Sequence, residues 1–234
     1  MSLIYEGQLN HGELFHVHQL AMNDISEILR LQNDVYEKIA NKSQLAKLTE
    51  DEYKYILTGN GLMLGAYVND ELIAIRALLV PEEDDPEHLG KDVGLTDEQL
   101  SEVIYQEISF VNPDFQGNRL QQTLATLIMD ELAKRPHNYR YVCCTVAPFN
   151  IPSLIDKFRQ GMYVKALKLK YDDQLRYIFL KDLKQDLLSD HIEEKQDVPI
   201  DSINKQQTLF ASGWVGVTLK RNGHSYAITY VKNK

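Results

Sequence analysis

Cysteine is scarce in this chain of 234 residues, which contains only the adjacent pair Cys143 and Cys144. Neighbouring cysteines cannot build the disulfide framework of a small secreted protein, and they lack the spacing of a metal site. The stretch around them is apolar, so we interpret at least one of the two as a core residue rather than a nucleophile. This use of cysteine predicts a reducing cytoplasm as the location of the protein.

Long apolar runs and an excess of positive charge are also missing. No run of about 18 apolar residues occurs, so we expect no transmembrane helix. The first residues, MSLIYEGQLNHGELF, lack a basic region followed by an apolar segment, so we expect no signal peptide. Lys and Arg number 25 against 34 Asp and Glu, a net charge of −9. This balance argues against a nucleic-acid partner, because a phosphate backbone favours a basic surface.

Three histidines near the start, His11, His16 and His18, raise the question of a metal ion. On a strand, His16 and His18 would share one face. The sequence offers no identifiable third ligand beside them, so it predicts no metal site.

What remains has the composition of a globular protein, with 44% hydrophobic and 25% charged residues. Hydrophobic periodicity predicts strands and helices in alternation, without an internal repeat. The predicted order is a strand at 13–20, helices at 25–40 and 48–57, a hairpin at 62–80, a loop at 81–102, a strand at 103–111, a helix from about 120, a strand at 139–149, a helix at 150–161 and a hairpin at 163–183. We interpret 184–206 as a polar connector and 207–234 as a C-terminal β-hairpin extension.

Short polar pairs between apolar runs predict where the hairpins turn, namely at Asn69-Asp70, Asp172-Asp173 and Asn222-Gly223. Other polar residues predict where helices begin. Asn23 or Asp24 would cap the first helix, and Thr49 with Glu52 three residues later forms a capping box for the second. A single helical turn is expected from Thr96, inside the acidic loop.

The stretch EISFVNPDFQGNRLQQTLATLIMDELAKRP, residues 107–136, puts a strand, a tight turn and a helix in immediate succession. Leucines and an isoleucine recur from Leu120 to Leu132 with a period near 3.6, which is typical of an amphipathic helix. Gly117 directly precedes this helix and can take a positive φ. Backbone N–H groups at a helix start lack partners within the helix and lie at its positive end, so this turn suits an anion.

The order of elements, together with FVNPDFQGNRL, resembles the GNAT superfamily of N-acetyltransferases over about residues 12–183. The family's signature turn, V-x-P-x-x-(Arg/Gln)-G-x-G-(Ile/Leu)-G, is matched here by Val111, Pro113, Gln116, Gly117 and Leu120. Asn150 matches the residue that opens the next family helix, and Gly161 the glycine that follows it. The resemblance implies an α/β (α+β) fold with a GNAT-like mixed central sheet flanked by helices.

Acetyl-CoA is the co-substrate that the resemblance implies. The residues implied to bind it are Phe110, Val111, Gln116, Gly117, Asn118, Arg119, Leu120, Gln121, Asn150 and Ser153. Arg119 and Gln121 depart from the family, which usually has glycines at these positions. Because backbone N–H groups carry most of the binding, Arg119 could still serve, either adding a cation to the pyrophosphate or pointing to solvent.

The resemblance further implies that an amine attacks the thioester directly in a ternary complex. Pantetheine would lie between strands 108–111 and 141–146, and a backbone N–H near Phe110 or Val111 would bind the thioester oxygen. Glu107 is our candidate general base, on a strand face with Tyr105, Ser109 and Val111. Tyr105 or water is the alternative for this role, and Glu107 could instead be a surface or salt-bridged carboxylate.

The general acid is less well defined by the resemblance. The family often uses a Tyr in the helix after Asn150, and the corresponding position holds Lys157 or, with a slip of one residue, Phe158. Lys157 could instead be an ordinary solvated lysine on the helix surface. Tyr163 is our candidate substitute, with water as the alternative because a thiolate leaves readily.

The acceptor is expected to be a primary amine on a small molecule or a peptide. Acidic residues of the 81–102 loop would favour a cationic acceptor, or would simply keep the loop solvated: Glu82, Glu83, Asp84, Asp85 and Glu87. Two other classes stay open. One is a non-catalytic CoA-binding regulatory or structural protein, and the other is a nucleotide-phosphate binder, although GNRLQQT lacks the Lys-Ser/Thr of a phosphate loop. We expect the C-terminal hairpin to pack on the catalytic domain, and we favour a homodimer over a monomer, which stays open as the alternative.

Overall fold

The computed structural model describes residues 3–39, 42, 46–171, 173–185 and 192–233. The chain divides into two compact units. The first comprises the chain up to Val80 together with Tyr105–Asn138, and the second comprises Pro81–Ile104 together with the chain from Tyr139 onward. Within the described ranges, none of the helices combines the length and the apolar character needed to cross a bilayer.

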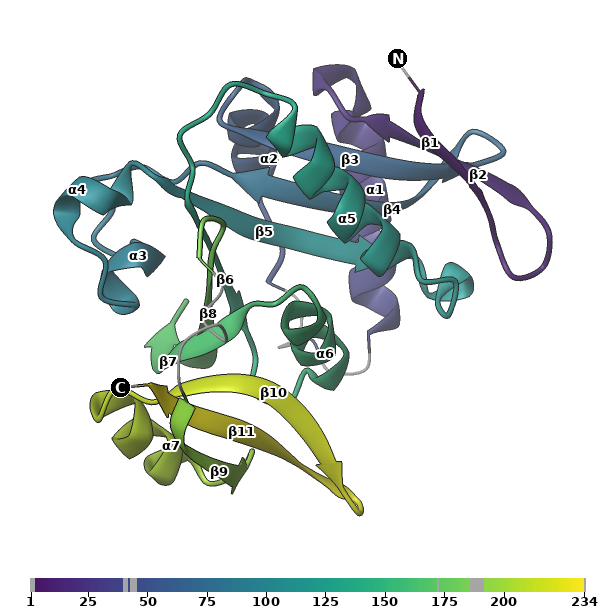
Figure 1. The fold of residues 1–234 in the computed structure, drawn as a ribbon. Helices are drawn as coiled ribbons and strands as arrows, with labels where there is room; N and C mark the ends of the chain where they lie inside the picture. The colour runs from purple at the N-terminus through teal and green to yellow at the C-terminus, as the bar shows by residue number, and fades with distance from the viewer. Residues whose placement is uncertain (1–2, 40–41, 43–45, 172, 186–191, 234) are drawn as a thin grey trace. The chain divides into compact units, whose positions relative to one another are not determined.

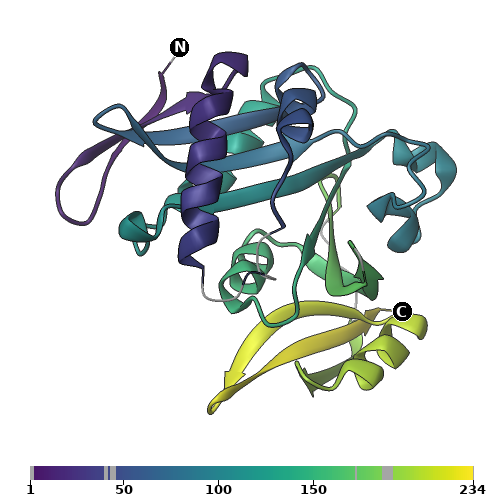
Figure 2. The same cartoon turned by 180° about the vertical axis from the view of Figure 1, so that it is seen from behind.

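Antiparallel strands form the sheet of the first unit, in the order β1-β2-β3-β4-β5. They are β1 (Leu3–Gln8), β2 (Leu14–Gln19), β3 (Gly61–Val68), β4 (Glu71–Leu79) and β5 (Val103–Val111). Helices α1 (Ile25–Lys38) and α2 (Glu50–Leu57) cover one face, and α5 (Leu120–Ala133) covers the other, as Figures 1 and 2 show. The predicted strands, hairpin and helices of this region are confirmed, whereas β1 was not predicted.

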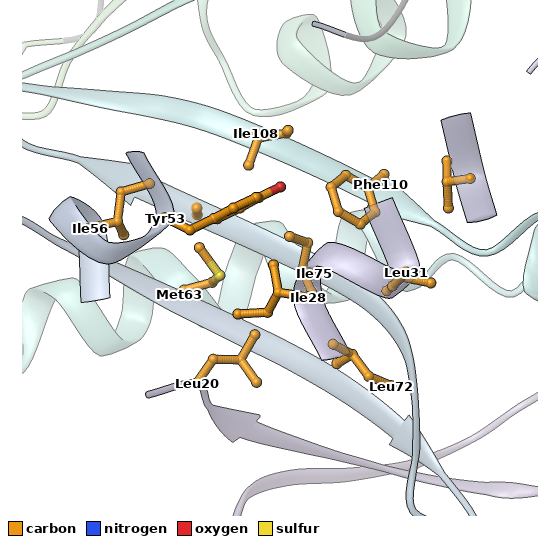
Figure 3. Packing of buried hydrophobic residues seen from close by; sticks show 12 residues of the cluster. Leu20, Ile28, Leu31, Tyr53, Ile56, Met63, Leu72, Ile75, Ile108 and Phe110 are labelled. Atoms are coloured by element: carbon orange, nitrogen blue, oxygen red, sulfur yellow. The ribbon is translucent and has the colours of Figure 1, made fainter. Parts of the chain in front are cut away.

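Helices α1 and α2 pack on this sheet through a continuous apolar cluster (Figure 3). Ile28, Leu31 and Val35 follow one another at helical spacing and face the strands, because i, i+3 and i+7 lie on one side of a helix. From α2, Tyr53 and Ile56 enter the same cluster, and each is almost fully buried. Burying an aliphatic side chain such as Ile28 or Leu31 contributes about 1.5–3 kcal/mol to the stability of the fold.

Gln32 ties the start of α2 to α1 from inside this core. Its side-chain Oε1 accepts hydrogen bonds from the Leu48 backbone N–H (2.9 Å) and from the Tyr53 hydroxyl (2.7 Å), while its Nε2 donates to the Leu48 carbonyl (2.9 Å). The predicted capping box of α2 is confirmed, since Thr49 and Glu52 satisfy each other's backbone N–H groups. Together these bonds hold the first turn of α2, and with it Glu52, in one place.

The second unit contains the remaining strands, in the order β6-β8-β7-β10-β11-β9. They are β6 (Tyr141–Val146), β7 (Tyr163–Lys170), β8 (Gln174–Asp182), β9 (Ile192–Pro199), β10 (Val215–Asn222) and β11 (Ser225–Asn233). Its helices are α3 (Leu89–Asp92), α4 (Asp97–Leu100), α6 (Ile151–Arg159) and α7 (Ile203–Ala211). The predicted helical turn after Thr96 is confirmed as α4, and the predicted buried strand as β6.

The prediction of a polar connector at 184–206 is wrong for the part that the structure describes. Residues 192–199 form β9, which pairs antiparallel with β11, and residues 203–211 form α7. The reason for the miss is that β9 is largely exposed and buries only Val198, so its sequence, IEEKQDVP, lacks apolar alternation. Pairing with a partner strand, rather than a hydrophobic face, makes this segment a strand.

The C-terminal hairpin is confirmed as β10 and β11, with two corrections. Residues 207–211 belong to α7 and not to the hairpin. The turn is Gly223-His224 instead of Asn222-Gly223, because Asn222 pairs with Ser225. Gly223 is then the first central residue of the turn and has φ +61°, a position that favours glycine in one of the common two-residue turns. Of the predicted turn Asp172-Asp173, Asp172 lies outside the described residues.

The hairpin is built into the sheet of the second unit. Strand β10 pairs with β7 through Gly216 and Val164, and β9 pairs with the other edge of β11. From α7, Gln206 is fully buried and accepts hydrogen bonds from the hydroxyls of Tyr177 (2.7 Å) on β8 and Tyr230 (2.6 Å) on β11. These contacts join the C-terminal elements to β7 and β8.

Candidate functional site

Strand β5 carries a β-bulge at Glu107. Ala77 of β4 is paired with Ile108, and the next residue, Leu78, is paired with Gln106, so Glu107 is an extra residue without a partner on β4. Strict alternation, which placed Glu107 on the face of Tyr105, Ser109 and Val111, therefore does not hold here. A bulge changes the direction of a side chain relative to regular alternation, and here that side chain carries a carboxylate.

The environment of Glu107 raises its pKa to about 7. Burial is the first cause, because removing a carboxylate from water disfavours its charged form, and the negative charge of Glu52 on α2 is the second. Glu107 in turn contributes to the raised pKa of the Tyr53 hydroxyl, so it acts on the same side of the sheet as α2. A carboxyl group with a pKa near neutrality can both accept and release a proton at physiological pH.

Beyond β5 lies the Gly117 turn, which we define as residues 112–119. Asn112 caps a short 3-10 turn, Pro113–Phe115, by accepting a hydrogen bond from the Asp114 N–H at 3.2 Å. Gly117 then takes φ +83° and Arg119 φ +59°, so two of the last three residues before α5 are left-handed. Gly117 is conformationally free to do this, whereas Arg119 accepts backbone strain at the N-cap of α5.

The start of α5 presents unpaired backbone donors. In the described part of the chain, no acceptor is paired with the backbone N–H groups of residues 117–122, and no side chain caps the helix. The first turn of α5 also contains no acidic residue. Unpaired N–H groups and the positive end of a 14-residue helix together form a site suited to an anion such as a phosphate.

Contacts from three elements hold the Gly117 turn and the first turn of α5. The Lys38 ammonium at the end of α1 lies 2.7 Å from the Asp114 carboxylate. Arg76 on β4, which is buried, donates to the Gln121 carbonyl at 3.3 Å and to Gln106 Oε1 at 2.7 Å. Asn10, between β1 and β2, bonds to Gly117 and Asn118. Sequence reasoning missed all three residues, because nothing local in the sequence marks such distant partners.

The first unit thus brings together most of the predicted residues. Gln116, Gly117 and Arg119 are exposed in the Gly117 turn, with Asn118 half-buried beside them. Leu120 is buried under α5, and Phe110 lies in the core cluster, so these two could reach a ligand only through their backbones. Gln121 is half-buried in the first turn of α5, and Tyr105 is buried on β5.

Four predicted residues lie in the second unit. Asn150 is the N-cap of α6, as predicted, and its side chain accepts a hydrogen bond from the Ser153 N–H at 3.3 Å. Tyr163 begins β7 and is half-buried, and burial is the main cause that raises its pKa to about 12. Lys157 is buried beside Asp156, with 3.4 Å between ammonium and carboxylate, so its interpretation as a solvated surface lysine is wrong.

Both cysteines are buried on β6, which agrees with their interpretation as core residues. Burial raises the pKa of the Cys143 thiol, and the neighbouring Cys144 adds to this effect. The thiolate is the nucleophilic form, so this environment disfavours covalent chemistry at Cys143. Among the described residues, no group of three or more His, Cys, Asp or Glu side chains is placed to hold a metal ion.

Part of the acidic loop is neutralised within the second unit. The Lys170 ammonium, which is buried, lies 2.5 Å from the Glu87 carboxylate and 2.9 Å from that of Asp92. Lys168 lies 2.8 Å from the same Asp92. These pairs hold the segment around α3 against β7, so Glu87 is committed to a structural contact.

Comparisons with known proteins establish the fold. No protein-family model and no curated protein sequence matches this chain. Among solved structures, Arabidopsis thaliana NAA60 in complex with acetyl-CoA is similar at 13% identity and a TM-score of 0.55, over 73% of this chain and 99% of that one. An acetyltransferase of the GNAT family from Streptococcus pneumoniae matches at 15% identity and a TM-score of 0.53, over 72% and 99%.

A third similar structure is the ribosomal-protein-S18-alanine N-acetyltransferase from Escherichia coli, at 14% identity and a TM-score of 0.53, over 72% of this chain and 94% of that one. Each of these matches spans nearly all of the other protein and leaves about a quarter of this chain without a counterpart. The chain has the GNAT acetyltransferase fold with additional strands, and the predicted fold class is confirmed.

Proposed function

We propose that this chain is an acetyl-CoA-dependent N-acetyltransferase that moves an acetyl group to a primary amine by direct attack in a ternary complex. The observation that carries the proposal is the succession of β5, the Gly117 turn and α5, with the N–H groups of residues 117–122 unpaired. This feature occurs on the fold shared with acetyltransferases, one of them solved with acetyl-CoA.

The residues of the Gly117 turn fit the pyrophosphate of acetyl-CoA. Gly117 has φ +83°, and the space that a Cβ would occupy there is open, so a ligand can approach its backbone closely. The exposed Arg119 adds a cation at the same place. When bound, acetyl-CoA supplies a thioester as the source of the acetyl group. Phe110 or Val111 would contribute a backbone N–H toward the thioester oxygen, in line with the prediction from the sequence.

Glu107 would take the proton that the attacking amine must lose. An alkyl amine with a pKa of about 10.4 is protonated at neutral pH, and removing its proton there costs roughly 4 to 5 kcal/mol. A carboxylate whose pKa is about 7 accepts that proton far more readily than a free glutamate. The ammonium would give its first proton to Glu107, directly or through a water molecule, and the free amine would then attack. As the C–N bond forms and the C–S bond breaks, the nitrogen loses a second proton to water.

The departing thiolate needs a proton from another group. Tyr163 is a weaker acid than a free tyrosine, because burial raises its pKa to about 12, so it donates a proton less readily than an exposed tyrosine would, and water is the alternative donor. Asn150, Ser153 and Tyr163 remain predicted site residues of the second unit.

We propose that the protein is cytoplasmic and that its acceptor is a primary amine of a small molecule or a peptide.

One observation favours the second candidate, a CoA-binding protein without turnover. Arg119 and Gln121 replace family glycines, and Arg119 holds a left-handed conformation in which an arginine is strained. A binding role needs only the Gly117 turn, whereas acetyl transfer also needs the base.

The two candidates are separated by measuring thiol release from acetyl-CoA in the presence of a panel of primary amines. Turnover with any amine, abolished together with acetyl-CoA binding in a Gly117→Glu variant, supports the enzyme. Tight calorimetric binding of acetyl-CoA without thiol release for any amine supports the binding protein. Absence of both binding and release contradicts both candidates.

A further inference from the structure

The geometry points to Asn10, in the turn between β1 and β2, as a positioning residue that orients the Gly117 turn for acetyl-CoA. This inference rests on the proposed function. Asn10 is separated by 108 residues from Asn118 and by 107 from Gly117, and it meets both in the first unit.

Asn10 makes two hydrogen bonds to the Gly117 turn. Its backbone N–H donates to Asn118 Oδ1 at 2.8 Å, and its side-chain Nδ2 donates to the Gly117 carbonyl at 3.2 Å. Asn118 in turn donates from Nδ2 to the Phe115 carbonyl at 2.9 Å. The Asn118 side chain therefore bridges the β1–β2 turn and the beginning of the Gly117 turn.

The bond to the Gly117 carbonyl sets the direction of a donor. A peptide unit is planar and trans, so the carbonyl of Gly117 and the N–H of Asn118 point in opposite directions. Holding the carbonyl toward Asn10 makes the Asn118 N–H point away from the β1–β2 turn. Glycine has more backbone freedom than any other residue, so without this bond the peptide after Gly117 could rotate. Asn10 thus selects one orientation of the Asn118 N–H, one of the donors that we propose for the pyrophosphate.

The β1–β2 turn, residues 9–13, is held by hydrogen bonds of its own, so it can keep Asn10 in one place. Leu9 is buried at its base, and the Leu9 N–H donates to the Glu13 carbonyl at 2.8 Å. The Gly12 N–H donates to the Leu9 carbonyl at 2.9 Å, and Gln8 Nε2 donates to the Gly12 carbonyl at 2.9 Å. Asn10 is exposed between these bonds and makes two hydrogen bonds to the Gly117 turn.

Two substitutions of Asn10 separate orientation from charge. Asn10→Ala keeps the backbone bond to Asn118 and removes only the bond to the Gly117 carbonyl. Asn10→Asp replaces the donor by a carboxylate, which repels the Gly117 carbonyl and adds negative charge beside a site for phosphate. Gln8→Ala is the matched control, because it removes a side-chain bond of the same turn that does not reach the Gly117 turn.

The test uses the full chain and measures acetyl-CoA affinity by calorimetry and steady-state kinetics with one amine. We expect Asn10→Ala to raise the Kd and KM for acetyl-CoA about fivefold, the effect of one neutral hydrogen bond, with kcat and the KM for the amine within twofold. Asn10→Asp should raise the Kd and KM for acetyl-CoA more than Asn10→Ala does. The difference between the two variants should become smaller at high salt, because salt screens the added negative charge. Gln8→Ala should leave them unchanged.

The outcomes distinguish this inference from the proposed function. If the unaltered protein binds acetyl-CoA and Asn10→Ala binds it equally well, Asn10 does not position the turn and only this inference fails. It fails in the same way if Asn10→Ala lowers kcat or melting temperature without changing the acetyl-CoA constants, or if Gln8→Ala has the same effect as Asn10→Ala. If the unaltered protein binds no acetyl-CoA, the proposed function and this inference both fail.

Discussion

The negative charge of Glu52, in the first turn of α2, raises the pKa of Glu107 at the bulge of β5, second only to the effect of burial. Glu52 is held in place because its Oε2 accepts hydrogen bonds from the Thr49 N–H (2.6 Å) and hydroxyl (2.7 Å). The residue that completes the capping box of α2 thereby raises the pKa of the group that we propose as the general base.

This relationship predicts a shift in the pH dependence of activity. If Glu107 is the base, kcat/KM should rise with pH through a midpoint of about 7, because the carboxylate is the active form. Glu52→Gln retains the capping geometry and removes the charge, so it should move the midpoint to lower pH. Asp51→Asn, an exposed neighbour on α2, is the control and should leave the midpoint in place. Equal midpoints in the original chain and Glu52→Gln would contradict the assignment of Glu107.

Removing the carboxyl group should separate activity from stability. Glu107→Gln should lower turnover roughly 100-fold, the scale of a lost general base, with little change in acetyl-CoA affinity.

The same variant should be more stable than the original chain at high pH. The raised pKa of Glu107 makes folding less favourable once the pH exceeds the unfolded pKa of 4.5, and this loss of stability is complete above about pH 7. At pH 8, the free energy of unfolding of Glu107→Gln should therefore be up to about 3 kcal/mol higher than that of the original chain.

The same denaturation experiment at low pH supplies its own control. Below pH 4.5 the Glu107 carboxyl group is protonated in both the folded and unfolded chains, so the difference between Glu107→Gln and the original chain should vanish. A stability difference that does not change between pH 4 and pH 8 would show that Glu107 has an ordinary pKa.

At Gly117, charge should matter more than size. The space around its absent Cβ is open, so Gly117→Ala should meet no clash and should lose stability only through the left-handed φ, by about 1 kcal/mol. Gly117→Glu adds a negative charge where we expect the pyrophosphate and should abolish acetyl-CoA binding. Gly213→Glu is a matched control, since Gly213 has φ +82° and equally open surroundings. Binding within a few-fold of normal in Gly117→Glu would remove this turn from the proposal.

The buried Gln206 should be a determinant of stability rather than activity. Its Nε2 donates to the carbonyls of Pro199 (3.3 Å) and Ile200 (3.0 Å), and its Oε1 accepts from two tyrosine hydroxyls. Gln206→Leu would leave these groups unpaired inside the second unit, at a cost of roughly 2–4 kcal/mol in the free energy of unfolding. Lys205→Gln, at an exposed neighbouring position, should change it by less than about 0.5 kcal/mol. Urea denaturation of both variants measures the difference.

Local patterns in the sequence predict the elements on which the candidate site is built. The capping box of Thr49 and Glu52 needs only residues three apart, and the two-residue turn at Asn69-Asp70 needs only its flanking strands. Likewise, β5, the Gly117 turn and α5 follow from apolar runs and one glycine within about thirty residues. Caps, turns and helices close their hydrogen bonds within a few residues of the chain, and the apolar run of β5 marks that segment as a strand without showing which strand it pairs with.

What the tertiary structure decided lies in partners that are distant along the chain. The bulge at Glu107 depends on how β5 pairs with β4, so alternation within β5 could not reveal it. The raised pKa of Glu107 needs α2 packed beside it, and the support of Asn10 under Gly117 spans 107 residues. Strand β9 exists through its pairing with β11, since its own sequence buries almost nothing. A sequence determines periodicity and turns, whereas burial, charge proximity and strand register arise only when remote segments meet.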